Sequence, residues 1–307
     1  MKKITVIGSI NTDLVVRSAT IPRAGQTLMG HSFMTTGGGK GANQAVAAAR
    51  LGGRVTLVGK VGNDSFGQTA IENFRKEGMD VSHIYCDELS PSGIAVIVVD
   101  DLGENIIVVA PGANAGLSIN DLLNAEPQIE EADIVLFQLE IPMATVAAGI
   151  SIAKKYARTV ILNPAPAAII PDEILQSVDV IVPNQTEADL LTGISVIDMA
   201  TAGTASEYLH AKGIPVVILT MGEQGAYLSS ATFKGRVPGF ETGTVIDTVA
   251  AGDTFCGGLA IALAKGKPLK QAVEFANAAA GIAVTRAGAQ SSIPFEMEVE
   301  RLLQSRG

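Results

Sequence analysis

One carboxylate, Asp253, ends a run of small residues and begins a long apolar segment, in the sequence Thr248-Val249-Ala250-Ala251-Gly252-Asp253-Thr254-Phe255. Small side chains let backbone N–H groups approach an anion closely, and the expected helix adds the positive end of its dipole. A phosphate bound there repels a carboxylate, which favours a working role for Asp253 as the general base of an attack on phosphorus. Capping of the helix by Asp253 explains the same residue equally well.

Side chains that suit a polyhydroxylated ligand occur near the start of the chain. Asn11 and Asp13 follow the first apolar run, and both accept hydrogen bonds from hydroxyl groups. A simple turn at residues 8–13 is the competing interpretation. Residues 36–45, TGGGKGANQA, form a glycine-rich approach to a helix. They are not a P-loop, because a glycine follows Lys40 where a P-loop has Ser or Thr.

Three more polar segments follow strand-like runs: Leu139-Glu140, residues 183–187 (PNQTE) and residues 220–226 (TMGEQGA). Each has a plain structural explanation, because Glu and Asn often begin helices and a glycine turn can simply close a hairpin. Their recurrence favours a ligand site, since the carboxyl ends of parallel strands meet at one edge of a sheet.

The segments that must position these residues alternate between two patterns. Short β-branched runs occur at residues 4–7, 55–58, 134–137, 160–162, 178–182 and 216–219. Segments with helical spacing occur at residues 43–51, 68–76, 144–156 and 187–191, and alanine-rich helices are expected within 251–286 and 294–303. The alternation predicts an α/β fold with a mainly parallel central sheet and helices on both faces.

Two segments depart from this alternation, because strand-like runs follow each other there without an intervening helix. We expect residues 13–33 and 93–111 to pair as a small antiparallel β lid over the ligand cleft. Edge strands of the main sheet are the alternative interpretation. The expected organisation is one α/β domain made of residues 1–12, 34–92 and 112–307, together with this lid.

Composition and charge limit the possible partners. The 307 residues are 47% hydrophobic and 17% charged, which is enough for a sizeable core. A net charge of -9 with no basic cluster repels nucleic acid and anionic membranes, so neither is an expected partner. The first apolar run is broken at residues 11–13, before a signal peptide or membrane span is complete. We therefore expect a cytoplasmic protein.

Taken together, these motifs resemble the ribokinase family of sugar kinases. The resemblance is carried by GSINTD (8–13), GGKGANQA (38–45), LNPAPA (162–167), PNQTE (183–187), TMGEQG (220–225) and DTVAAGDTF (247–255). It implies the family's α/β fold with a β lid, and ATP-dependent phosphorylation of D-ribose at its C5 hydroxyl to give ribose 5-phosphate. A kinase of the same fold acting on deoxyribose or fructose, or a non-catalytic sugar sensor, is the alternative.

The resemblance also implies which residues form the site. The sugar would contact Asn11, Asp13, Gly39, Lys40, Asn43, Glu140 and Asp253. Asp253 would be the base, and Ala250, Ala251 and Gly252 would form an anion hole around the transferred phosphoryl group. ATP would contact Asn184, Thr220, Met221, Gly222, Glu223, Gln224, Gly225, Gly252 and Asn277.

Two cations and an assembly follow from the same resemblance. Glu187 would help to place Mg²⁺, without necessarily binding it directly. A monovalent cation, K⁺, would lie beside the anion hole, mostly on backbone carbonyls, at Asp247, Val249, Ala283, Arg286, Gly288 and Ser292. The resemblance implies a homodimer formed through the lid. An intact Asp253 argues against a sensor, because a sensor needs no base.

Overall fold

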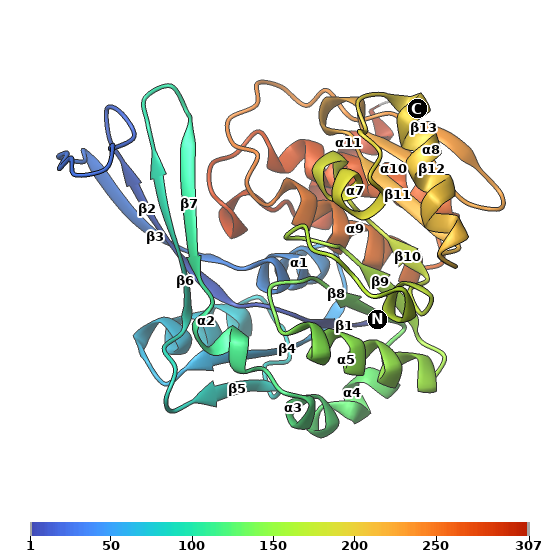
Figure 1. Cartoon of the computed structure of the whole chain (residues 1–307), viewed down its shortest axis with the longest axis horizontal. Coiled ribbons are helices and arrows are strands. Elements are labelled where there is room, and N and C mark those ends of the chain that lie inside the picture. Colours follow the sequence, from blue (N-terminus) through green and yellow to red (C-terminus); the bar gives the residue numbers. More distant parts are fainter. Residues whose placement is uncertain (1, 306–307) are drawn as a thin grey trace.

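The computed structural model describes residues 2–305 and contains two separate sheets. The larger sheet forms the centre of an α/β body, and the smaller one projects from it at the left of Figure 1. No helix within the described part of the chain has both the length and the apolar composition needed to cross a bilayer.

The central sheet has nine strands in the order β13-β12-β11-β10-β9-β8-β1-β4-β5. Their bounds are β1 Lys3–Ile7, β4 Arg54–Gly62, β5 Ile84–Asp87, β8 Ile134–Phe137, β9 Thr159–Leu162, β10 Val180–Ile181, β11 Val216–Thr220, β12 Ala226–Ser229 and β13 Lys234–Val237. The strands from β5 to β11 in this order pair in parallel, and β12 and β13 are antiparallel. This confirms the prediction of a mainly parallel sheet.

Helices cover both faces of this sheet and enclose two apolar cores. One core includes residues of α1 Lys40–Arg50, α2 Ser65–Lys76, α9 Ala251–Ala264, α10 Leu269–Ala283 and α11 Glu296–Gln304. The other includes residues of α3 Ile119–Asn124, α4 Glu126–Glu130, α5 Met143–Lys155, α6 Asp172–Leu175, α7 Gln185–Thr192 and α8 Met199–Ala211. Three 3₁₀ turns complete the body: η1 Gly112–Gly116, η2 Gly222–Gln224 and η3 Gln290–Ser292.

Some boundaries differ from the expected ones for local reasons. The run at 178–182 contributes only β10, because the N–H of Val178 bonds to Leu175 O in the turn that ends α6. The helical segment 251–286 is divided into α9 and α10 by Gly266, which has φ +79°, and by Pro268, which precedes α10.

The smaller sheet consists of two hairpins in the order β3-β2-β6-β7. Its strands are β2 Asn11–Arg17, β3 Ser32–Gly38, β6 Gly93–Val99 and β7 Asn105–Ala110. Each hairpin is antiparallel, but the two inner strands β2 and β6 pair in parallel because both leave the body in the same direction. The expected antiparallel pairing is thus confirmed within each hairpin, whereas the pairing between the hairpins is parallel. Because it is separate from the central sheet, the edge-strand interpretation was wrong.

Close packing of α1 against α9 sets the geometry of the site. A Cβ on Gly257 would lie 2.6 Å from Ala47 Cβ and 2.7 Å from Gln44 O, so a side chain there would force the helices apart. Glycine at this crossing brings the first turns of the two helices together. Those turns carry Asn43 and Asp253.

Candidate active site

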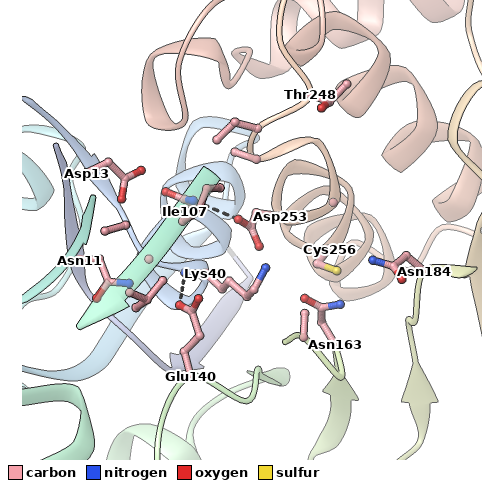
Figure 2. A pocket seen from close by; sticks show the side chains of 18 of the residues that line it. Asn11, Asp13, Lys40, Ile107, Glu140, Asn163, Asn184, Thr248, Asp253 and Cys256 are labelled. Atoms are coloured by element: carbon pink, nitrogen blue, oxygen red, sulfur yellow. Dashed lines mark hydrogen bonds between the residues drawn. The ribbon is translucent and has the colours of Figure 1, made fainter. Parts of the chain in front are cut away.

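A cavity of about 340 Å³ lies where the carboxyl ends of the parallel strands meet the smaller sheet. Figure 2 shows Asp13, Asn11 and Ile107 on one side of it and Asn163 and Asn184 on the other. Most of the predicted site residues line it: Asn11, Asp13, Gly39, Lys40, Asn43, Glu140, Asn184, Glu187, Thr220, Val249, Ala250, Gly252 and Asp253. Six segments far apart in the sequence thus meet at one place.

Asp253 is the third residue of α9 and does not cap that helix. Its Oδ1 accepts a hydrogen bond from Gln44 Nε2, and its Oδ2 accepts one from Asn43 Nδ2, both at 3.0 Å. The capping interpretation is therefore wrong. Burial raises the pKa of Asp253 above its ordinary value, although the nearby Lys40 charge and the two amide donors act in the opposite direction. The chemistry available to this carboxyl is that of a buried proton acceptor.

The N-terminus of α9 is open toward the cavity. No side chain among the described residues caps it, and the preceding residue, Ala250, has φ +60°. A Cβ on Gly252 would meet no atom within 4 Å, so this glycine borders empty space. A helix N-terminus next to unfilled space suits an anion, in agreement with the expected anion hole. The N–H of Ala251 is partly used by a long hydrogen bond of 3.3 Å to Thr248 O.

Asn11 and Asp13 lie within β2, so the turn interpretation of these residues was wrong. Asn11 Oδ1 accepts from Asn114 Nδ2 at 2.8 Å, and its amide nitrogen faces the cavity in Figure 2. On the facing helix, the buried Asn43 Oδ1 has no hydrogen-bond partner within residues 2–305. These groups offer a donor and an acceptor to a ligand with hydroxyl groups.

Two glycines allow this close approach of β2 to the start of α1. A Cβ on Gly38 would lie 2.2 Å from Asp13 Oδ1. Gly39 has φ +88°, and a Cβ there would lie 2.6 Å from the backbone nitrogen of Asn11. Any larger residue would displace the polar side chains of β2.

Charged groups cluster in the cavity. Burial raises the pKa of Asp13 to about 7, and the negative charges of Glu140 and Asp253 add to the effect. Glu140 accepts from the backbone N–H of Lys40 at 3.0 Å and so holds the start of α1. Burial lowers the pKa of Lys40, but the carboxylates of Asp253, Glu140 and Glu187 outweigh it and the pKa is raised. In Figure 2 the Lys40 ammonium points to the space beside Asp253.

On the opposite side, Asn184 and Glu187 begin α7 as a capping box. Asn184 Oδ1 accepts from the Glu187 N–H, and Glu187 Oε2 accepts from the Asn184 N–H, both at 2.8 Å. They are thus helix-start residues that also line the cavity. Of residues 220–225, Thr220 borders the cavity, and the rest form a hairpin turn between β11 and β12. Asn277 lies outside the cavity lining and donates to two backbone carbonyls, those of Val237 and Pro238.

The residues expected around K⁺ come from two loops joined by Asp247. Its Oδ1 accepts from the Val249 N–H and its Oδ2 from the Gly288 N–H, both at 2.9 Å. Arg286 forms an ion pair with Glu298, so its side chain is engaged elsewhere. Ala283 ends α10, and Ser292 is buried in η3. Within residues 2–305 no group of three or more His, Cys, Asp or Glu side chains is placed to hold a metal.

The loops joined by Asp247 and the carboxylate of Glu187 fit the expected cations. Two loops rich in backbone carbonyls and a single carboxylate suit a weakly charged cation such as K⁺. Glu187 accepts two hydrogen bonds from Asn184, which leaves lone pairs for a metal-bound water and agrees with an indirect role toward Mg²⁺.

Several lining residues were missed by sequence reasoning. The smaller sheet contributes apolar side chains: Ala95, Ile97, Ile107 and Val109. On the body side the cavity is also lined by Asn163, Ala165, Val182, Thr248 and Cys256. Asn163 directly follows β9, so the rule that selected Glu140 after β8 was sufficient to find it. The apolar residues of the small sheet carry no such signal, because their pattern is that of any strand.

Comparison with known proteins agrees with this geometry. The profile of the pfkB family of carbohydrate kinases matches residues 1–296. The chain is 45% identical over 303 residues to the ribokinase of Haemophilus influenzae, covering 99% of each. It is 37% identical over 292 residues to the deoxyribokinase of Salmonella typhi, covering 95% of each. The structure of Arabidopsis thaliana ribokinase complexed with ribose and ATP has a TM-score of 0.91, with 32% identity and 99% of each chain covered.

Proposed function

Because the chain belongs to the pfkB family of carbohydrate kinases, we propose that it transfers the γ-phosphoryl group of ATP to the C5 hydroxyl of D-ribose. The product is ribose 5-phosphate. The name and the bound ligands of the Arabidopsis thaliana structure support both substrates. Since ATP is the proposed donor, we also infer that the enzyme works in the cytoplasm.

The observation that carries this proposal is the position of Asp253 within one cavity. Asn11 and Asp13 lie on one side of the cavity in Figure 2, and we assign this side, together with Asn43, to the sugar. Asn184 lies on the opposite side, and we assign this side, together with Glu187, to the nucleotide. Asp253 therefore stands between the proposed acceptor and the proposed donor.

In the proposed reaction, Asp253 takes the proton from the sugar hydroxyl as its oxygen attacks the γ-phosphorus in line, and ADP leaves. Alignment of two bound reactants lowers the activation barrier by about 7–11 kcal/mol. A general base increases the reaction rate roughly a hundred- to ten-thousandfold, which corresponds to a smaller reduction of the barrier. Alignment thus contributes more than the base. Backbone donors at Ala250, Ala251 and Gly252 stabilise the transferred group, at about 3–4 kcal/mol for each donor of this kind.

Further contacts in the proposal follow the expected ones. Lys40, Gly39 and Glu140 complete the sugar site. Thr220 and the turn at residues 221–225 contact ATP. Asn277 was expected to contact ATP as well, but its amide donates to Val237 O and Pro238 O, so we assign it the support of the loop after β13. Glu187 would help to place Mg²⁺, which would supply positive charge to the phosphates. The loops joined through Asp247 would hold K⁺ beside the anion hole.

One assay tests the function. ADP release is measured with D-ribose, 2-deoxy-D-ribose and D-fructose, each with and without K⁺. We expect the highest kcat/KM with D-ribose. Faster turnover on another sugar reassigns the substrate, and no sugar-dependent ADP release with any of them favours the sensor. In Asp247→Ala, activation by K⁺ should weaken, because this carboxylate bonds to both loops.

We propose that two copies assemble through the smaller sheet, which acts as a lid. The strand register places Phe33, Val96, Ile106 and Val108 on the face turned away from the cavity, and all four are exposed. A contiguous exposed apolar surface of this kind is typical of a protein–protein interface. A second copy supplies an identical apolar face, as a two-fold interface requires.

A further inference from the structure

A group of buried amide side chains connects two strand ends and the start of α1 with Asp253. Gln138 follows β8, Asn163 follows β9, and Gln44 lies in the first turns of α1. Gln44 and Gln138 are fully buried, and Asn163 is 8% exposed. The proposed mechanism gives none of the three a contact with sugar or ATP.

Gln44 is the centre of this group. Its Nε2 donates to Asp253 Oδ1 and to Asn163 Oδ1, both at 3.0 Å. Its Oε1 accepts from Gln138 Nε2 at 2.6 Å. Both amide hydrogens and the carbonyl oxygen of Gln44 are therefore used.

The direction of every bond in the group is set by one backbone carbonyl. Asn163 Nδ2 donates to Val182 O at 2.9 Å, and a backbone oxygen can only accept. The Asn163 oxygen must then face Gln44, which must present its nitrogen to Asn163 and Asp253. A reversed Gln44 amide would place an oxygen against a carboxylate and its nitrogen against the nitrogen of Gln138. The arrangement thus admits one orientation of Gln44.

Gln138 is retained at an energetic cost. Its Oε1 is buried and has no hydrogen-bond partner among the described residues. A Cβ on Gly8 would lie 1.9 Å from this oxygen, so the amide is also confined by packing. An unpaired buried carbonyl oxygen is unfavourable. The donor that Gln138 supplies to Gln44 offsets this cost.

The charges around Asp253 explain why a fixed donor matters. Asp13 of β2, Glu140 after β8 and Glu187 of α7 bring negative charge toward the cavity, and Lys40 of α1 is the facing cation. The thiol of Cys256, on α9 itself, has its pKa raised well above its ordinary value by burial and stays neutral. A base in this setting needs hydrogen-bond donors to remain ionised.

We propose that Gln44 is a positioning residue for the general base, held in its working orientation by Gln138 and Asn163. It fixes one oxygen of Asp253 and favours the ionised carboxylate that accepts the sugar's proton. This inference rests on the proposed role of Asp253. It adds a residue that touches neither substrate.

The main test is the pH dependence of kcat in Gln44→Met, which keeps the side-chain length and removes both donors. We expect kcat at pH 7 to fall about ten- to a hundredfold, the equivalent of one charge-assisted hydrogen bond. The acidic limb of the kcat profile should move up by about one pH unit or more, so that part of the activity returns at higher pH. The KM for sugar should change much less.

A second variant and a control complete the test. Gln138→Met removes the donor that orients Gln44 and should move the same limb in the same direction by a smaller amount. Thr5→Val removes a different buried hydrogen bond, from Thr5 Oγ1 to Gln128 O at 2.8 Å. It should lower the urea midpoint of unfolding without moving the pH profile.

The outcomes separate the two proposals. Unmoved acidic limbs in both Gln variants, even with reduced kcat, overturn the positioning role. If Gln44→Met does not fold, the acidic limb of the kcat profile of Gln138→Met alone decides whether the positioning role holds. Lack of ribose phosphorylation by the unaltered enzyme contradicts the proposed function instead, and the pH profiles are then measured with whichever sugar it phosphorylates.

Discussion

Asp253 and Asp13 are buried carboxylic acids in the same cavity, but their surroundings differ. Burial raises the pKa of both groups. Asp253 also accepts two side-chain hydrogen bonds and lies near Lys40, and these contacts favour its ionised form. The pKa of Asp13 is raised further by the charges of Glu140 and Asp253. Asp253 is suited to take a proton and Asp13 to meet a ligand hydroxyl.

Replacement of Asp253 by Asn should almost abolish turnover while sugar binding persists. The amide has the shape of the carboxylate but cannot accept the proton, so we expect kcat to fall about a hundred- to ten-thousandfold. Steady-state kinetics gives kcat, and isothermal calorimetry gives the affinity for sugar. Turnover near that of the unaltered enzyme would show that another group is the base.

Asp13 should make the unliganded protein less stable as the pH rises. Its folded-state pKa is about 7 against an ordinary value of 3.8, so between these values the folded protein binds more protons than the unfolded chain. Its contribution to stability falls as the pH rises through this window. Asp13→Asn should thus be roughly 2–4 kcal/mol more stable than the parent at pH 8, with the difference closing toward pH 4. Urea unfolding at several pH values measures this, and a constant difference contradicts it.

At the scale of elements, the first turns of α1 and α9 define the site because glycine lets the two helices touch. Asn43 and Gln44 of α1 reach Asp253 of α9 across 210 and 209 residues of sequence. The order of strands and helices was predictable, since each element carries its own periodicity. The parallel pairing of β2 with β6 was not, because it depends on the direction in which two separate hairpins leave the body.

The site residues likewise differ in how readily they could be predicted from the sequence. Asn11, Asp13 and Glu140 were found because polar residues directly after buried runs are unusual locally. Gln138 directly follows β8, so the same rule was sufficient to select it, but Gln44 lies within a helix and nothing near it in sequence shows that the two amides meet. The role of these two residues follows only from the contacts that they make in the folded protein. Sequence reasoning therefore finds groups that face a ligand more readily than groups that support them.

The open N-terminus of α9 makes a prediction for Gly252→Ala. The added methyl meets no protein atom, so the fold should persist, but it fills space assigned to the phosphoryl group. We expect kcat to fall about tenfold or more with Tm unchanged or raised, since Ala favours helix. Gly203→Ala, within α8, is the control for adding a methyl to a helix glycine away from the cavity, where the methyl would lie 3.1 Å from the Tyr227 hydroxyl oxygen. Wild-type turnover in Gly252→Ala would contradict the anion hole.

At the scale of the whole molecule, the smaller sheet exposes apolar side chains on two faces. Ile107 and Val109 face the cavity, whereas Ile106 and Val108 face outward, and all four are at least 43% exposed. Figure 1 shows this sheet extending beyond the body, so body helices do not cover its outer face. The proposed assembly and the proposed closure of the site would thus use opposite faces of the same strand.

Val108→Asp should convert the proposed dimer to a monomer. A carboxylate at the centre of an apolar interface must be desolvated, which disfavours association. Sedimentation velocity measures the change. Ile197→Asp, at a similarly exposed apolar position beside α8, should leave the assembly unaltered. A dimer that survives Val108→Asp, or a monomeric parent protein, would exclude this interface.

Gly8 shows that the hydrogen bonds around Asp253 constrain residues that do not contact it. It has no side chain to offer a substrate, yet a single methyl there would occupy the place of the Gln138 amide oxygen. The disturbance would pass from Gln138 to Gln44 and from Gln44 to Asp253, because each holds the next. The absence of a side chain at Gly8 thus leaves room for the amide that orients Gln44, and a mutation there should resemble a mutation of the proposed base.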